Sequence, residues 1–124
     1  MKFARIVFWI AGAYGVLVLA PAYFLFDMAG RVDPPPITHP QFYYGFVGVA
    51  LAWQAAFFVI ARDPLRFRPM MIPAVLEKVG YAGAILVLRL QGRIAPAAVL
   101  TGLPDALMAV LFVMAFFKAK PARP

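Results

Sequence analysis

The feature that most limits the possible folds of this chain is the segment from Ile6 to Phe26, which holds 21 consecutive residues without a charge. A transmembrane helix needs about 20 such residues, because each residue advances about 1.5 Å and the hydrocarbon core is about 30 Å thick. Comparable apolar stretches cover about 42–61, 70–90 and 96–117. The sequence therefore predicts an all-α, four-helix transmembrane bundle, with residues 1–124 forming a single integral membrane domain.

The composition agrees with a membrane location. Hydrophobic residues make up 65% of the chain and charged residues 14%, whereas soluble domains average about 45–50% and about 25%. The net charge of +7 could indicate a nucleic-acid partner. However, the basic residues form short clusters between the apolar runs, where they determine topology. We therefore expect the lipid bilayer as the partner and no nucleic acid.

The first apolar run shares one feature with cleaved signal peptides, because Ala20-Pro21-Ala22 fits the small-x-small cleavage pattern. Three observations favour a retained helix instead. The run continues to Phe26, it is longer than a signal core of about 7–15 residues, and Pro21 lies within the potential site. After this span, Pro34-Pro35-Pro36 predicts an extended connection over residues 27–39. Thr38 is then expected to cap the next helix.

Lysine and arginine residues at the span ends predict the orientation, because cytoplasmic loops carry an excess of both. One side of the membrane holds eight of them: Lys2, Arg5, Arg62, Arg66, Arg68, Lys118, Lys120 and Arg123. The other side holds three: Arg31, Arg89 and Arg93. Both termini are therefore expected in the cytoplasm, in a multi-pass protein of the bacterial inner membrane. We interpret Arg62, Arg66 and Arg68 as topology determinants that contact anionic lipid head groups.

Two patterns predict how the spans pack. Small residues four positions apart allow helix backbones to approach closely in lipid, and three spans contain such a pair: Ala11 and Gly15, Gly48 and Ala52, Gly80 and Ala84. Short loops follow the second and third spans, which predicts that consecutive helices are antiparallel neighbours. Tyr23, Tyr43 and Tyr44 are expected to lie together at the outer membrane interface.

The third span contains two adjacent charges, Glu77 and Lys78. A charge near the bilayer centre costs about 2.5–3.5 kcal/mol on insertion scales, so such groups face protein or water. Adjacent helical residues point in different directions, so we do not expect the two to pair. Glu77 shares a stripe with Gly80 and Ala84 and is expected to face the bundle. Lys78 shares a stripe with Tyr81 and is expected to extend to the cytoplasmic head groups.

Gln54 is the predicted partner of Glu77. The two residues are equally distant from the centre of the loop between their spans, at about 17 Å of helix, and an antiparallel hairpin would place them at one depth. Tyr14 lies at a similar depth and could add a hydroxyl. Two interpretations of this group remain open: a structural interhelical hydrogen bond, or a site for a proton, an ion or a ligand.

Asp105 is the third candidate acidic residue, and its depth depends on where the fourth span begins. A start near Pro96 places Asp105 in mid-membrane, whereas a start at Pro104 places it near the outer surface, in a first helical turn. A helix from Pro104 to Phe117 would be only about 21 Å long. We therefore expect helical structure to begin before Pro104, with a kink at that residue.

Several kinds of chemistry find no support in the sequence. The chain has no cysteine and one histidine, His39, so it cannot supply two axial histidines to a haem. Neither a phosphate-binding glycine loop nor a catalytic triad is present. We therefore assign no catalytic residue, no metal site and no cofactor, and we do not expect a self-contained enzyme.

Three short motifs resemble the DoxX-like group of small bacterial membrane proteins: Phe42-Tyr43-Tyr44-Gly45-Phe46, Leu76-Glu77-Lys78, and Pro104-Asp105-Ala106-Leu107 before Phe112. This resemblance implies four spans and a membrane subunit. Some members of the group are associated with quinone-linked redox complexes. Because the chain lacks cysteine and has one histidine, the resemblance implies a non-redox subunit.

These observations favour a non-catalytic accessory subunit or assembly component, with a membrane-protein partner or a homo-oligomeric state. One alternative is a small oligomeric transporter or channel with Glu77 as its intramembrane titrating site and Lys78 or Asp105 as charge partners. Another is a membrane enzyme or binding protein that acts on a lipid or isoprenoid.

Overall fold

The computed structural model describes residues 2–120, and over this range the chain is helical and contains no strand. Four helical segments are long and apolar enough to cross a membrane: Lys2–Phe24, Pro40–Arg62, Arg68–Leu90 and Pro96–Lys118. The predicted all-α class is confirmed, and four helices able to cross a membrane lie where the spans were predicted, with ends that differ by a few residues. The sequence located the spans well because the thickness of the bilayer sets their length.

The helical elements follow one another with short connections. They are α1 (Lys2–Leu19), the 3₁₀ segment η1 (Ala20–Phe24), α2 (Phe26–Val32), α3 (Pro40–Arg62), η2 (Arg68–Met70), α4 (Met71–Leu90), η3 (Pro96–Thr101) and α5 (Leu103–Lys118). Prolines stand in the first turns of α3 and α5, where a missing N–H costs nothing. Gly92, with φ +70°, follows the end of α4 in the left-handed conformation that glycine adopts most readily.

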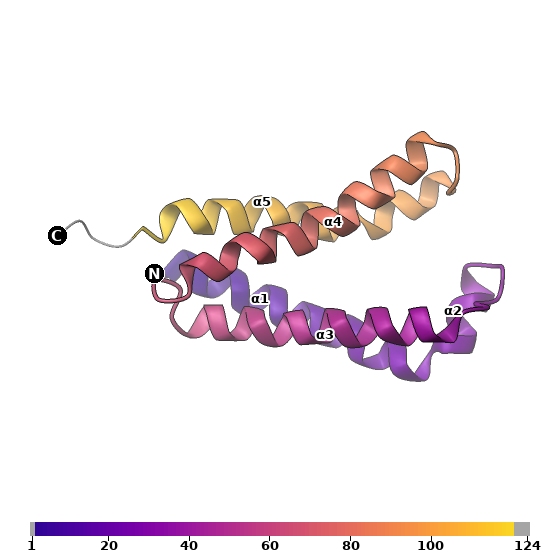
Figure 1. Cartoon of the computed structure of the whole chain (residues 1–124), viewed down its shortest axis with the longest axis horizontal. Coiled ribbons are helices and arrows are strands. Elements are labelled where there is room, and N and C mark those ends of the chain that lie inside the picture. Colours follow the sequence, from indigo (N-terminus) through magenta and orange to yellow (C-terminus); the bar gives the residue numbers. More distant parts are fainter. Residues whose placement is uncertain (1, 121–124) are drawn as a thin grey trace.

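The chain forms two helical hairpins (Figure 1). Helices α1 and α3 pack together as one pair and α4 and α5 as the other, while α1 also contacts α5. Helices α3 and α4 diverge from the turn that joins them and make few contacts. The prediction that consecutive helices are antiparallel neighbours therefore holds for α4 and α5, whereas α3 and α4 make few contacts. The N-terminus, the 62–70 turn and the end of α5 lie at one end of the structure, and α2 lies at the other.

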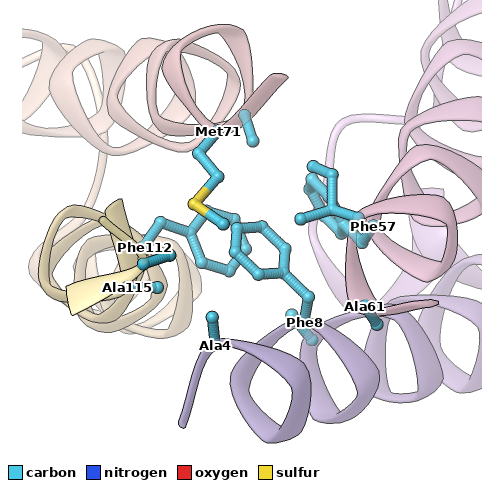
Figure 2. Packing of buried hydrophobic residues seen from close by; sticks show 11 residues of the cluster. Ala4, Phe8, Phe57, Ala61, Met71, Phe112 and Ala115 are labelled. Atoms are coloured by element: carbon cyan, nitrogen blue, oxygen red, sulfur yellow. The ribbon is translucent and has the colours of Figure 1, made fainter. Parts of the chain in front are cut away.

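An aromatic cluster joins the two hairpins near the end that carries the termini (Figure 2). The Phe8 ring stacks on Phe112 with centroids 4.3 Å apart, and Phe57 contacts both, at 5.9 Å and 5.1 Å. Met71 of α4 is also fully buried there, so all four spans contribute to the cluster. Because lipid is as apolar as these side chains, close packing holds the cluster together more than exclusion of water does.

One of the three predicted small-residue pairs lies in a helix contact. Ala11 and Gly15 of α1 are buried, and a Cβ atom added to Gly15 would collide with the side chain of Gln54 on α3. In contrast, Ala52 and Gly80 are exposed. Gly48 of α3 lies against η1, where a Cβ atom added to it would be 3.3 Å from the Tyr23 hydroxyl, whereas Gly80 of the α4 pair has no neighbour within 4 Å of its Cβ position.

The first connection differs from its prediction, because residues 26–32 form the short helix α2 where an extended chain was expected. Asp27 in its first turn and Arg31 in its last turn complement the helix dipole. The predicted cap is also wrong. His39 is the N-cap residue of α3 without a side-chain hydrogen bond, and Thr38 Oγ1 instead lies 3.0 Å from Nδ1 of His39.

Side-chain contacts at both ends of the molecule link neighbouring helical segments. Tyr23 and Tyr43 both stack or pack on Tyr44, as predicted, and the Tyr43 hydroxyl donates a 2.7 Å hydrogen bond to the carbonyl of Ala22. At the opposite end, Arg68 Nε donates a 2.8 Å hydrogen bond to the carbonyl of Phe116.

The Arg68 guanidinium also lies 3.7 Å from the centroid of the Phe116 ring. Arg68 therefore ties the start of α4 to the end of α5, whereas Arg62 and Arg66 are exposed. Contact of these residues with anionic lipid stays a prediction. Arg123, one of the eight residues assigned to the cytoplasmic side, lies outside the described residues.

Candidate functional site

Lys78 is the most deeply buried charged residue of the described chain, with 6% of its side chain exposed. Its Nζ atom lies 3.4 Å from Oε2 of Glu77 and 3.5 Å from Oδ1 of Asp105. The same atom lies 5.1 Å from the centroid of the Phe57 ring. The prediction that Lys78 extends to the head groups is therefore wrong, because two carboxylates and an aromatic face hold the ammonium within the protein.

The arrangement of the helices explains this correction. The buried face of α4 contains Met71, Ala74 and Lys78, because α5 and the aromatic cluster cover that side. Gly80 lies on the stripe predicted to face the bundle, yet a Cβ atom added there would have no neighbour within 4 Å. The prediction that adjacent charges do not pair is also wrong, since the long lysine side chain reaches the carboxylate of Glu77.

Asp105 belongs to the middle of the fourth span. Helical structure begins at Pro96 in η3 and changes to α-helix at Leu103, which confirms the predicted start before Pro104. Gly102 at the change is buried, and a Cβ atom there would lie 3.2 Å from Ile85 of α4. The absence of a side chain thus brings the start of α5 close to α4, with Asp105 in the first turn of α5 and facing Lys78.

Gln54 does not form the predicted hydrogen bond with Glu77. Its Nε2 atom donates a 2.8 Å hydrogen bond to the carbonyl of Ala50, one turn earlier on the same helix. Its Oε1 atom is buried and has no hydrogen-bond partner among the described residues. The two side chains stay apart because α3 and α4 diverge, so equal depth along the helices did not bring them into contact.

A cavity of about 370 Å³ lies between the two hairpins and borders this group. All five residues predicted as the polar site line it: Tyr14, Gln54, Glu77, Lys78 and Asp105. The cavity gathers residues from α1, α3, α4 and α5, so it exists only in the folded chain. Its role as a functional site stays a prediction.

Tyr81 and Thr101 also line the cavity, and the sequence analysis did not assign them. The Tyr81 hydroxyl donates a 3.1 Å hydrogen bond to Oγ1 of Thr101, which donates a 2.7 Å hydrogen bond to the carbonyl of Ala98. Tyr81 lies three residues after Lys78 on one helix face, so its place could have been inferred from that of the lysine.

The cavity contains more negative than positive formal charge. Two carboxylates face one ammonium, and the acceptors Gln54 Oε1 and Glu77 Oε2 receive no hydrogen bond in the part of the chain described here. Glu77 Oε2 contacts the ammonium of Lys78, but without the alignment of a hydrogen bond. Among residues 2–120, no group of three or more His, Cys, Asp or Glu side chains could hold a metal ion.

No family model, curated protein or solved structure matches this chain. Arguments about function therefore depend on the site itself. Its chemistry is that of a charged, acceptor-rich group held within four apolar helices.

Proposed function

We propose that this chain is a non-catalytic component of a bacterial inner-membrane assembly, in which it packs against a transmembrane helix of another membrane protein. The observation that carries the proposal is the position of Glu77. This residue lines both the polar cavity and a groove on the outer side of the two hairpins. Its Oε2 atom is buried against the ammonium of Lys78, while the side chain as a whole is 20% exposed, so a donor in the groove would approach the other carboxylate oxygen.

The groove runs between α3 and α4 and has a volume of about 580 Å³. Gly45 of α3 and Gly80 of α4 lie on its two walls, and nothing lies within 4 Å of a Cβ position at either glycine. Small residues on both walls would allow another helix backbone to approach closely. The groove thus has open space beside Gly45 and Gly80, where the backbone of a docked helix would approach most closely.

The chemistry of Glu77 indicates what the partner helix should carry. Lipid tails cannot donate hydrogen bonds, so an acceptor at mid-membrane gains from a polar donor on a neighbouring helix. The excess negative formal charge of the cluster also favours a donor or a cation over an acidic residue. We therefore expect the partner helix to place a hydroxyl, amide or basic side chain beside Glu77.

The arrangement of the ends supports an orientation with both termini in the cytoplasm. The N-terminus, the 62–70 turn and the end of α5 lie at one end, and this end carries most of the basic residues. The DoxX-like resemblance remains part of the proposal, as a non-redox subunit of that group.

The test is native mass spectrometry after gentle extraction of the tagged protein from its own membranes. The expected result is a mass well above the 13.6 kDa of the chain, with at least one other polypeptide. Since the chain lacks cysteine, single cysteines can then map the contact. Gly80→Cys in the groove should cross-link to the partner, whereas Val87→Cys, exposed elsewhere on α4, should not.

Glu77→Gln should lower recovery of the partner, because the variant loses the charge that the donor complements. A chain recovered only as a monomer or homo-oligomer, with no other polypeptide, would refute the proposal. Equal cross-linking from positions 80 and 87 would refute the assignment of the groove.

A second candidate function is proton or ion transport by a homo-oligomer with Glu77 as the titrating site. The supporting observation is the change from 3₁₀ to α-helix at Gly102, beside the charges of Lys78 and Asp105 in mid-membrane. Interrupted helices of this kind occur at ion sites of transporters. The purified chain in liposomes would then carry protons across the membrane, and Glu77→Gln would abolish the flux while leaving the oligomer intact.

A further inference from the structure

A second groove lies on the far side of the molecule, between α1 and α5. It has a volume of about 850 Å³, and its lining is almost wholly apolar, with residues such as Ile6, Ile10 and Leu107. This volume lies within the range of about 300–1,000 Å³ that is usual for ligand sites. The groove is separate from the proposed helix-docking groove between α3 and α4.

The α1–α5 groove and the polar cavity are neighbours. Tyr14, Leu100 and Pro104 line both spaces. From Tyr14 the groove extends along α1 to Ile6, which corresponds to about 12 Å of helix. A single apolar chain could therefore lie in the groove while its polar end enters the cavity past Tyr14.

The cavity defines the chemistry of that polar end. Gln54 is 1% exposed, and its Oε1 atom packs against Gly15 and accepts no hydrogen bond within the described residues. A head group reaches this buried oxygen when the amide turns away from Gly15 toward the cavity. In a membrane interior an unsatisfied amide oxygen is costly, so the site favours a group that donates a hydrogen bond. Lys78 also lines the cavity, and its ammonium can donate to an oxygen of the same group.

Charge and hydrogen-bonding capacity each exclude one other class of head group. An anionic head would add to the excess negative charge of Glu77 and Asp105. A quaternary ammonium would offer no hydrogen to Gln54. A neutral hydroxyl both donates and accepts, so it can satisfy the amide oxygen and the ammonium together.

We propose that the cavity binds the hydroxyl head group of a single-chain amphiphile, whose apolar chain lies in the groove between α1 and α5. This inference does not depend on the partner helix, because it uses the other side of the molecule. The proposed ligand differs from an ordinary bilayer lipid, because the acyl chains of a lipid would fill the groove without placing a hydrogen-bond donor in the cavity.

The test uses the full-length chain in nanodiscs and hexadecanol that carries a photoreactive diazirine in its chain. After illumination, the labelled peptides should be those of α1 and α5 that line the groove. Unlabelled hexadecanol should compete with the probe. Hexadecyl methyl ether, which has the same chain but cannot donate a hydrogen bond, should compete about tenfold less well, equivalent to about 1.4 kcal/mol.

Two variants separate the chain from the head group. Ile10→Trp fills the groove at a position that is 63% exposed, and it should lower labelling of α1 and α5. Its matched control, Val59→Trp on the exposed face of α3, should leave labelling unchanged. Gln54→Met removes the amide oxygen, and it should make the alcohol and the ether equal competitors in a variant that still unfolds cooperatively.

Equal competition by the alcohol and the ether in the parent protein would overturn the proposal, because the groove would then hold any apolar chain. Labelling spread evenly over the four spans would do the same. If Gln54→Met does not fold, the comparison of the two competitors on the parent protein still decides the question. Loss of the partner polypeptide in the native mass spectrum would not change either result.

Discussion

Replacing Lys78 with methionine should destabilise the fold strongly, although methionine is the more apolar residue. The ammonium contacts two carboxylates at 3.4 Å and 3.5 Å, and each contact corresponds to about 5 kcal/mol of Coulomb energy at an effective dielectric constant of about 20. Most of this energy offsets the cost of removing the charges from water. Without Lys78, two carboxylates that are each only 20% exposed face one another with no cation between them.

Removing one partner of a buried ion pair costs about 3–5 kcal/mol. Because Glu77 and Asp105 keep some exposure, we expect a loss of about 2–4 kcal/mol for Lys78→Met. Asp105→Asn alone should cost less, since Glu77 still accompanies the ammonium. The combined variant Glu77→Gln, Lys78→Met, Asp105→Asn should return to within about 1 kcal/mol of the parent, since it leaves no unpaired charge.

The assay is reversible unfolding in mixed micelles, in which sodium dodecyl sulfate is titrated into a mild detergent and tryptophan fluorescence is followed. Trp9 and Trp53 lie on α1 and α3 and report on one hairpin and its contacts. Lys2→Met, which removes an exposed charge, is the matched control and should stay within about 0.5 kcal/mol of the parent. The reasoning fails if Lys78→Met is as stable as this control, or if the combined variant is less stable than Lys78→Met.

The same unfolding assay checks three further predictions, and a labelling experiment checks a fourth. Gly15→Ala should cost about 1–3 kcal/mol, because its Cβ atom would overlap Gln54, whereas Gly45→Ala, in open space, should be neutral. Phe112→Ala should cost about 3 kcal/mol, because it removes the ring that contacts Phe8 and Phe57; a cost below that of Gly45→Ala would contradict the packing described. Arg68→Lys should lose about 1–2 kcal/mol with the hydrogen bond and the stacked ring, while Arg66→Lys should lose almost nothing. In intact spheroplasts, a membrane-impermeant maleimide should label Ala95→Cys and not Leu65→Cys, and the reverse pattern would invert the proposed orientation.

The sequence predicted the spans and the identity of the polar residues for the same physical reason. A lipid interior tolerates few charges, so the length of each charge-free run and the few charges within the runs are both informative. Glu77, Lys78 and Gln54 were therefore found without any knowledge of contacts. The structure places all three beside one cavity.

The contacts among these residues could not be predicted in the same way. Whether Glu77 or Lys78 faces inward depends on which helices cover α4. The sequence favoured Glu77 because it shares a stripe with the small residues Gly80 and Ala84. In the structure α5 packs on α4, and α3 makes few contacts with it. Lys78 is therefore the buried charge, while Glu77, about 100° away around the helix, stays partly exposed beside the cavity.

The environment of Asp105 depends on where the helical structure of the fourth span begins. Had the fourth span begun at Pro104, Asp105 would lie near the membrane surface, where water solvates a carboxylate at no cost to the fold. Because η3 begins at Pro96 and the change at Gly102 starts a new α-helix, Asp105 lies within the span and also at a helix N-terminus. The Asp105 carboxylate is then stabilised by the positive end of the helix dipole and by the ammonium of Lys78 at 3.5 Å.

Glu77 lies in the middle of α4, so only the ammonium of Lys78 stabilises its carboxylate. Glu77 is therefore the carboxylate with most to gain from a donor supplied by a partner helix.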